Sequence, residues 1–164
     1  MRWAVQEPLE TLEPVDLRAI AAEAIELVAA QAAARRVSVE LVPGPSPVVP
    51  GDPEGLFRLL SNLLENAVKY NLPDGTVTVT LESREDQAIV EVRDTGIGMP
   101  GSALPRIFER FYRVDKGRAR EEGGTGLGLA IVKHVAQAHH GRVEVESEPG
   151  RGSKFRVILP LQHA

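Results

Sequence analysis

Three polar residues recur along one face of a predicted helix. Asn62, Asn66 and Lys69 are spaced by four and three positions within SNLLENAVKY, so they share one stripe of the helix. Asparagine is a poor residue for a helix interior because its amide competes for backbone partners. The amide oxygen of Asn66 is a hard ligand suited to Mg²⁺, and the ammonium of Lys69 can neutralise phosphate charge beside it. The helix alone is explained equally well if both amides simply face solvent.

A carboxylate stands where an apolar strand meets a glycine turn. The strand AIVEVRD ends at Asp94, and TGIGMP follows. A carboxylate only accepts hydrogen bonds, so Asp94 can bind the exocyclic amine of adenine, which is a donor. Gly96 and Gly98 allow positive φ and let the backbone approach a flat ring closely. An Asp-initiated turn explains the same letters, so the motif is weak when taken alone.

A second glycine cluster stands where a loop becomes a helix. In GGTGLGLAIVK, Gly124, Gly126 and Gly128 occupy alternate positions before the apolar run. Free N–H groups at a helix N-terminus bind phosphate well. A flexible entry to a packed helix accounts for one glycine but not for three. No GxxxxGK[ST] segment occurs, so the chain is not a P-loop nucleotidase.

An aromatic and basic segment precedes a charged stretch without apolar periodicity. Phe108 and Phe111 of FERFYR can anchor the base of a lid, from which the planar guanidinium of Arg113 can reach a terminal phosphate. By itself, the segment is better explained as a surface helix with two core phenylalanines and solvated arginines. Residues 113–123 are expected to be mobile.

Length and composition fit one globular domain. The chain has 164 residues, of which 43% are apolar and 26% charged, and it is long enough to bury a sizeable core. The absence of cysteine excludes disulfides, thiolate metal sites and cysteine nucleophiles. A net charge of −4 gives no overall attraction to nucleic acid or anionic lipid. No apolar run reaches the roughly 18 residues that a membrane helix needs.

Helices are expected at four places. Asp16 is the N-cap candidate of a helix that ends near Arg36. The segment Asp52-Pro53-Glu54 begins the asparagine helix, which should run to about Tyr70. Its core-facing stripe is predicted to be Leu56, Leu59, Leu60, Leu63 and Ala67. One or two helical turns are expected over 106–112, and a further helix over 125–137.

Strands are expected mainly as two hairpins. Residues 37–42 alternate and predict a strand, and the turn-rich connector after them holds a short extended piece. The hairpins are predicted from residues 76–82 with 88–94, and from 143–147 with 153–160. We expect one domain over residues 15–161, between a linker or tail over 1–14 and a short tail over 162–164.

Taken in order, these motifs resemble the catalytic and ATP-binding domain of two-component sensor histidine kinases. The matching segments run from about Asp16 to Pro160 and are NLLENAVKY, DTGIGMP, IFERFYRVD, GGTGLGLAIVKH and PGRGSKFRVILP. Each motif is weak alone, but five in order make a very specific signal. The resemblance implies a Bergerat (GHKL) fold: an α/β two-layer sandwich with a mixed, mostly antiparallel sheet of about five strands packed on three helices. Type II topoisomerases, mismatch-repair ATPases and heat-shock chaperones share this fold.

The resemblance implies a Mg²⁺–ATP site built from these motifs. Mg²⁺ would be coordinated by Asn66, with the phosphates near Asn62 and Lys69. The adenine would pack by Tyr70, and its amine would be bound by Asp94. The base pocket would be shaped by Gly96, Ile97 and Gly98. The phosphates would be closed over by Gly124, Thr125, Gly126, Leu127 and Gly128. Phosphoryl transfer is expected to depend on Asn62, Lys69 and Arg113, the last of which would touch the terminal phosphate.

One position distinguishes a kinase from a hydrolase. Hydrolytic members of the fold place a glutamate one helical turn before the magnesium asparagine, where this chain has Asn62. An amide cannot act as a general base at neutral pH, so the nucleophile must come from outside. Glu65 should point elsewhere. Asn62 and FERFYR argue against a GHKL-type ATPase or an anti-sigma-type serine kinase, and the complete motif set argues against a member that only binds nucleotide or partner proteins.

Two departures from the family pattern bear on partners and on local structure. The phospho-acceptor histidine and its dimerising hairpin are missing, so the implied partner is that domain of the parent kinase, with a response regulator served indirectly. We expect a monomeric, cytoplasmic fragment of a membrane-anchored sensor. His139-His140-Gly141 stands where the family has His-Gly-Gly, so His140 is expected to adopt positive φ. The histidines lack a metal-ligand arrangement and are assigned helix-end or surface roles: His134, His139, His140 and His163.

Overall fold

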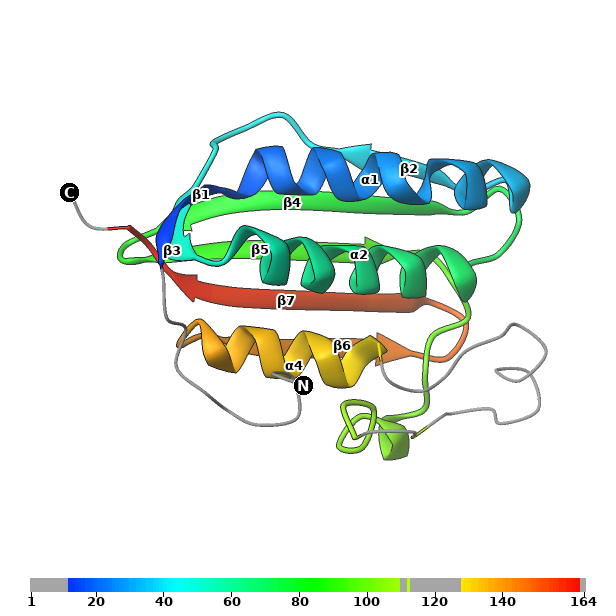
Figure 1. Ribbon diagram of the computed structural model, residues 1–164. Helices are drawn as coiled ribbons and strands as arrows, with labels where there is room; N and C mark the ends of the chain where they lie inside the picture. The colour runs from blue at the N-terminus through cyan, green and yellow to red at the C-terminus, as the bar shows by residue number, and fades with distance from the viewer. Residues whose placement is uncertain (1–11, 110–111, 113–127, 163–164) are drawn as a thin grey trace.

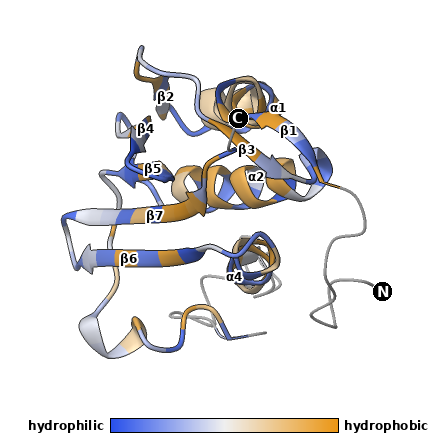
Figure 2. Cartoon of the chain, turned by 90° about the vertical axis from the view of Figure 1, so that its left-hand side faces the viewer, coloured by the Kyte–Doolittle hydropathy of each residue, from blue (hydrophilic) through white to orange (hydrophobic). Residues whose placement is uncertain are grey.

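The structure is a computed structural model that describes residues 12–109, 112 and 128–162. In this part of the chain, five strands form one sheet in the order β2-β4-β5-β7-β6, and three helices cover one of its faces (Figures 1 and 2). Only the β2–β4 pair is parallel, and the other three pairs are antiparallel. The predicted two-layer sandwich with a mixed, mostly antiparallel sheet is therefore confirmed.

The bounds of the main elements follow the sequence patterns closely. The helices are α1 (Leu17–Ala34), α2 (Pro53–Lys69) and α4 (Gly128–Ala138). The strands of the sheet are β2 (Ser38–Leu41), β4 (Thr76–Arg84), β5 (Gln87–Asp94), β6 (Arg142–Glu148) and β7 (Gly152–Pro160). Both predicted hairpins, β4–β5 and β6–β7, are present. Residues 125–127 of the expected last helix lie outside the described residues, as do residues 113–123.

The two long helices begin where their capping residues predict. The carboxylate of Asp16 accepts hydrogen bonds from the N–H groups of Arg18 (2.9 Å) and Ala19 (3.4 Å), which satisfies two donors of the first turn of α1. In α2, Pro53 occupies the first turn after Asp52, whose side chain makes no cap hydrogen bond. Proline fits this position because it has no N–H to satisfy and its φ is already helical.

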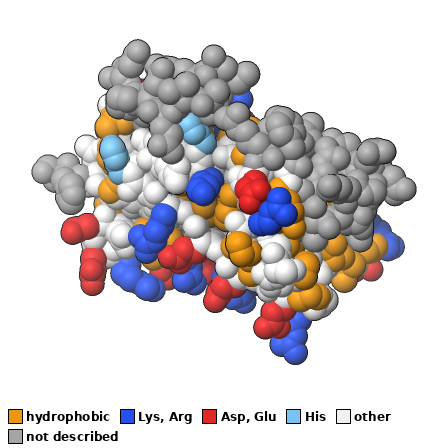
Figure 3. All heavy atoms as spheres, turned by 90° about the horizontal axis from the view of Figure 1, so that it is seen from below, with side chains coloured by type: hydrophobic (Ala, Val, Ile, Leu, Met, Phe, Trp, Pro, Cys, Tyr) orange, Lys and Arg blue, Asp and Glu red, His pale blue; other side chains and the backbone are white. Residues whose placement is uncertain are grey.

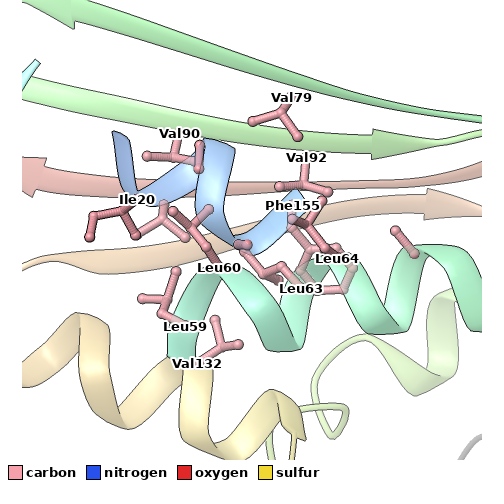
Figure 4. Packing of buried hydrophobic residues seen from close by; sticks show 14 of the residues in the cluster. Ile20, Leu59, Leu60, Leu63, Leu64, Val79, Val90, Val92, Val132 and Phe155 are labelled. Atoms are coloured by element: carbon pink, nitrogen blue, oxygen red, sulfur yellow. The ribbon is translucent and has the colours of Figure 1, made fainter. Parts of the chain in front are cut away.

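The core lies between α2 and the sheet, as Figure 4 shows. The predicted stripe of α2 is confirmed, since its members are at most 2% exposed: Leu56, Leu59, Leu60, Leu63 and Ala67. Opposite them, the sheet contributes Val79, Val90, Val92 and Phe155. Burying a side chain of this size contributes about 1.5–3 kcal/mol. The stripe therefore fixes the rotation of α2 and with it the direction of the helix's polar residues.

The outer face of the sheet carries charges of both signs. Oppositely charged side chains pair across neighbouring strands, as in Lys154–Glu146 (2.9 Å) and Arg156–Glu91 (3.1 Å). Figure 3, which views the molecule from the α4 and β6 side, shows basic and acidic side chains interspersed. Ion pairs at a protein surface contribute about 0–1 kcal/mol each, so these pairs add little to the stability of the fold.

A two-stranded sheet, formed by β1 (Glu13–Asp16) and β3 (Val48–Gly51), was not predicted as such. Glu13 and Pro14 fall in the expected linker, yet they pair with Gly51 and Pro50. Gln162 of the expected C-terminal tail also donates a backbone hydrogen bond to the carbonyl of Val48 (2.9 Å). Proline is tolerated here because the sheet consists only of edge strands.

The segment after β5 forms turns over the described residues 104–108, where part of the helical turns expected over 106–112 should lie; residues 110 and 111 of that range lie outside the described residues. A short 3-10 helix, η2 (Gly101–Ala103), is followed by hydrogen bonds that each span three residues. The N–H of Arg106 bonds to Ala103 (2.9 Å), and that of Glu109 bonds to Arg106 (2.9 Å). Among the described helices, none is both long and apolar enough to cross a membrane.

Candidate functional site

The end of α2 lies directly against the glycine turn that follows β5. The carbonyl of Tyr70 accepts a hydrogen bond from the N–H of Ile97 (3.1 Å). A Cβ atom at Gly96 would collide with the same carbonyl, so this approach requires glycine. Two motifs that are 26 positions apart in sequence at Tyr70 and Gly96 are thereby brought together, as the predicted site requires.

Asp94 is a buried carboxylate with a fixed orientation. It is 7% exposed, and its Oδ1 accepts hydrogen bonds from the N–H groups of Gly96 (2.9 Å) and Ser153 (3.3 Å). Burial raises the pKa of Asp94 from 3.8 to about 6, although these two N–H groups oppose the shift. Both of these hydrogen bonds go to Oδ1, and no described residue donates a hydrogen bond to Oδ2. The second oxygen is therefore left to accept a hydrogen bond from a ligand.

The glycine turn is held on its other side by the β6–β7 hairpin. Gly98 has φ of +71°, and a Cβ atom there would meet the carbonyl of Glu148. The N–H of Met99 donates to Ser147 Oγ (2.8 Å), and the N–H of Gly150 donates to the carbonyl of Ile97 (2.7 Å). Positive φ is thus needed at Gly98, whereas Gly96 is needed for close approach to Tyr70.

The polar stripe of α2 meets the start of α4. Asn62 donates through Nδ2 to the carbonyl of Arg58 (2.7 Å) within its own helix. A Cβ atom at Gly128 would stand 2.9 Å from Asn62 Oδ1. The structure therefore brings the asparagine helix and the end of the second glycine cluster into contact, which their sequence positions alone do not show.

Asn66 and Lys69 are half-buried further along the same stripe. Among the described residues, none forms a hydrogen bond with the side-chain amide of Asn66. The ammonium of Lys69 lies 5.9 Å from the centroid of the Tyr70 ring, within the range of a cation–π interaction. A hard amide oxygen and an ammonium on one stripe of a helix suit a metal-bound phosphate.

Part of the predicted phosphate-binding set cannot be placed. The residues that lie outside the described part are Arg113, Gly124, Thr125, Gly126 and Leu127. The base of the expected lid is described in part, because the Phe108 ring packs edge-on against Phe155, with centroids 6.2 Å apart. Phe111 also lies outside the described residues.

Comparison with known proteins decides the family. Residues 51–163 match the family described as histidine kinase-, DNA gyrase B- and HSP90-like ATPase. This chain belongs to that family. It is 43% identical to the phosphate regulon sensor protein PhoR of Pseudomonas aeruginosa over 153 residues, which are 93% of this chain and 34% of PhoR. The relatives are sensor histidine kinases, and the chain corresponds to their catalytic domain, as its motifs predicted.

Solved structures agree with this histidine kinase assignment. The structure of the mycobacterial sensor histidine kinase MprB has a TM-score of 0.79 at 31% identity and covers 94% of this chain and 100% of that one. The full-length ShkA structure, which is a complex with AMPPNP, has a TM-score of 0.84 at 32% identity over 99% of this chain and 34% of ShkA. The chain spans 24% to 40% of the length of the first curated relatives.

The burial of two polar residues in this domain was not predicted from the sequence. Asn71 is 7% exposed and bonds to β4 and to the glycine turn, although its sequence context indicates only a turn. His139 was assigned a helix-end or surface role; it does lie at the end of α4, but it is 3% exposed. Its Nε2 accepts from the N–H of Asp52 (3.0 Å), and its Nδ1 lies 2.8 Å from the carbonyl of Val135, so the Nδ1–H tautomer satisfies both nitrogens.

The remaining histidines follow the sequence expectation where they can be checked. His140 has φ of 62°, which confirms the predicted left-handed conformation at the helix end. No group of three or more His, Asp or Glu side chains that could hold a metal ion occurs among the described residues.

Proposed function

We propose that this chain binds Mg²⁺–ATP beside α2 and the glycine turn at Gly96–Gly98, and presents the terminal phosphate to a histidine on another domain of its parent protein. Family membership and the likeness to sensor histidine kinases support this function. The AMPPNP in the ShkA complex supports the choice of an adenine nucleotide triphosphate. The site residues are consistent with each part of that ligand.

The observation that carries the proposal is the hydrogen bonding of the buried Asp94 carboxylate. Its Oδ1 is held by the N–H groups of Gly96 and Ser153, and its Oδ2 is available to the exocyclic amine of adenine. Gly96 lies against the carbonyl of Tyr70, so no side chain intrudes between the carboxylate and the end of α2. A planar donor such as adenine fits this arrangement because the backbone is close and the acceptor is fixed.

The polar stripe of α2 would hold the phosphates. Asn66 offers an amide oxygen that no described residue uses, and Lys69 offers a positive charge on the next turn. Mg²⁺, when bound, would neutralise phosphate charge and orient the terminal phosphate for transfer. Asn66 would be its protein ligand, and Lys69 would hold phosphate oxygens by its charge. We further propose that Arg113 and the residues 124–128 complete this side of the site.

Asn62 favours transfer to another protein over hydrolysis. Its Nδ2 donates to Arg58 and its Oδ1 faces the start of α4, so an amide stands where a hydrolase needs a carboxylate. An amide cannot take a proton from water at neutral pH. Glu65, the nearest carboxylate along the helix, is exposed and does not belong to the half-buried stripe of Asn62 and Asn66. The nucleophile must then be supplied by a separate group, which in sensor histidine kinases is a histidine.

Because the nucleophile comes from a separate group, the chain needs a partner that carries it. We propose that the dimerisation and histidine phosphotransfer domain of the parent protein accepts the phosphate, and that a response regulator receives it from there. The chain spans only 34% of PhoR, which leaves room in a comparable parent for such a domain. The domain described here is expected to act as a monomer when it is separated from that partner.

A transfer assay tests the proposal. The 164-residue chain is mixed with a fragment of the parent that carries the acceptor histidine, together with Mg²⁺ and γ-labelled ATP. Label is expected on the acceptor fragment and not on the chain itself. In a separate nucleotide titration, Asn66→Ala is expected to remove the Mg²⁺-dependent part of binding. Label on the chain alone, or rapid release of inorganic phosphate without the acceptor, would contradict the proposed transfer.

A further inference from the structure

Asn71 is a buried amide at the junction of three elements. It follows the last turn of α2, and its side chain reaches the start of β4 and the residue after β5. Only 7% of the residue is exposed. A buried amide costs free energy unless its donors and acceptors are satisfied, so its position requires an explanation.

Each polar atom of the Asn71 side chain has a partner from a different part of the site. Nδ2 donates to the carbonyl of Thr76 (3.0 Å) at the start of β4. Oδ1 accepts from the N–H of Leu72 (2.8 Å) and from the hydroxyl of Thr95 (3.3 Å). Thr95 Oγ1 in turn accepts from the N–H of Thr76 (2.9 Å), which closes a small network. The network ties α2, β4 and the glycine turn together.

This network lies next to the carboxylate that would read the base. Thr95 is bonded covalently to Asp94, and the following residue, Gly96, donates its N–H to Asp94 Oδ1. A Cβ atom at Gly96 would stand 3.0 Å from the Cα of Asn71, so the two backbones are packed in contact. Movement of Asn71 therefore moves the turn on which the orientation of Asp94 depends.

We propose that Asn71 is a positioning residue for base recognition: its amide holds the Asp94–Gly96 turn against α2, so that Asp94 meets the adenine amine in a fixed orientation. This inference rests on the proposed nucleotide-binding function. Asn71 does not touch the base in this account; it acts through Thr95 and Asp94. Asparagine suits the position because one end of the amide donates while the other accepts.

Substitutions at Asn71 separate this role from a general effect on stability. Asn71→Ala removes the partners of Thr76, Leu72 and Thr95 at once. Asn71→Ser keeps a small, uncharged polar group that can bond to the nearby backbone but is too short to join Thr76 and Thr95, so it is a milder variant if Asn71→Ala folds poorly. Val90→Ala is the matched control, since Val90 is a buried residue in the middle of β5 and its loss destabilises the core away from the turn.

The test measures discrimination between two bases. The binding of ADP and of inosine diphosphate, which has a carbonyl in place of the amine, is titrated by NMR with the wild-type chain and the three variants. We expect Asn71→Ala to bind ADP about tenfold more weakly, which corresponds to about 1.4 kcal/mol, and to bind inosine diphosphate within twofold of wild type. Asn71→Ser is expected to give a smaller loss in the same direction, and Val90→Ala is expected to change neither affinity.

The outcomes distinguish this inference from the proposed function. A wild-type chain that binds neither nucleotide would overturn the proposed function itself. If the wild-type chain prefers ADP and both Asn71 variants keep the same preference, the positioning role is wrong while nucleotide binding stands. Equal losses for both nucleotides in the Asn71 variants would likewise contradict the inference, because they would indicate a general loss of structure.

Discussion

Asn62 and Gly128 lie in contact, although 66 positions separate them in sequence. A Cβ atom at Gly128 would stand 2.9 Å from Asn62 Oδ1, which is closer than real Cβ contacts allow. The contact joins the polar stripe of α2 to the first residue of α4. It explains why a residue with poor helix propensity begins a helix at this place.

Gly128→Ala is expected to weaken nucleotide binding with little loss of fold stability. Alanine restricts the unfolded chain more than glycine does and is the better helix former, which offsets part of the cost of the contact with Asn62. The displaced Asn62 amide would intrude on the phosphate side of the site, so we expect about five- to tenfold weaker ADP binding. Calorimetric titration and thermal unfolding check this.

Gly101→Ala is the control for that variant. Apart from its two chain neighbours, no described residue has an atom within 4 Å of a Cβ placed at Gly101, so the substitution tests the effect of a glycine-to-alanine change without a clash. It should leave ADP affinity within twofold. Equal affinities of Gly128→Ala and wild type for ADP would show that the Asn62–Gly128 contact does not matter for binding.

His139 is expected to make the stability of the fold depend on pH. Burial of the ring lowers the pKa of His139 from 6.5, although the hydrogen bond to the Val135 carbonyl and the negative charge of Asp52 oppose the shift. The stability from the neutral ring is therefore fully present above pH 6.5 and is lost as the pH falls toward the lower folded-state pKa. His139→Ala should lower the free energy of unfolding by about 2–4 kcal/mol at pH 8, through lost packing and hydrogen bonds.

The pH dependence of that loss is the informative part. Urea unfolding of wild type and His139→Ala is measured at pH 8 and at pH 5.5. The difference in the free energy of unfolding should be smaller at pH 5.5, because the wild type must then either protonate a buried ring or keep it neutral at a cost. A difference that stays constant between the two values would mean that His139 does not need to remain neutral in the folded protein.

Local signals in the sequence account for most of the fold. Asp16 and Pro53 mark helix starts, the leucine stripe of α2 marks the core, and alternation marks both hairpins; each is confirmed. These features depend on interactions between residues that are near in sequence or repeat at a fixed period. The resemblance of five ordered motifs then implied the sandwich that the structure has.

Interactions between distant residues account for what the sequence did not predict. The β1–β3 pair joins residues 13–16 to residues 48–51, and no local pattern in a proline-rich stretch indicates such a partner. The sequence around Asn71 indicates only a turn. Its bonds to Thr76 and Thr95 could not be predicted, because they depend on how three elements meet in space. His139 likewise depends on the N–H of Asp52, which is 87 positions away.

Asp94→Asn is expected to stabilise the chain in the absence of nucleotide near neutral pH. Burial raises the pKa of Asp94 to about 6, so the folded state prefers the neutral carboxyl. The stability from that neutral form is fully present below pH 3.8 and is lost as the pH rises through about 6. An uncharged amide avoids this cost, as is common where a binding site trades stability for function.

Thermal unfolding without nucleotide tests this cost. The melting temperature of Asp94→Asn minus that of wild type should be larger at pH 7.5 than at pH 4.5. A wild type that is the more stable of the two at pH 7.5 would argue that the N–H groups of Gly96 and Ser153 outweigh the burial of the charge.

The central claim is that Asp94 binds the adenine amine, and a titration of wild type and Asp94→Asn with ADP at pH 7.5 tests it most directly. A hydrogen bond to a charged group contributes about 1.5–3 kcal/mol, so the variant should bind about ten- to a hundredfold more weakly. The wild-type affinity should also fall as the pH drops through about 6, while the variant's changes little. Equal ADP affinities of the two proteins at pH 7.5 would contradict the account.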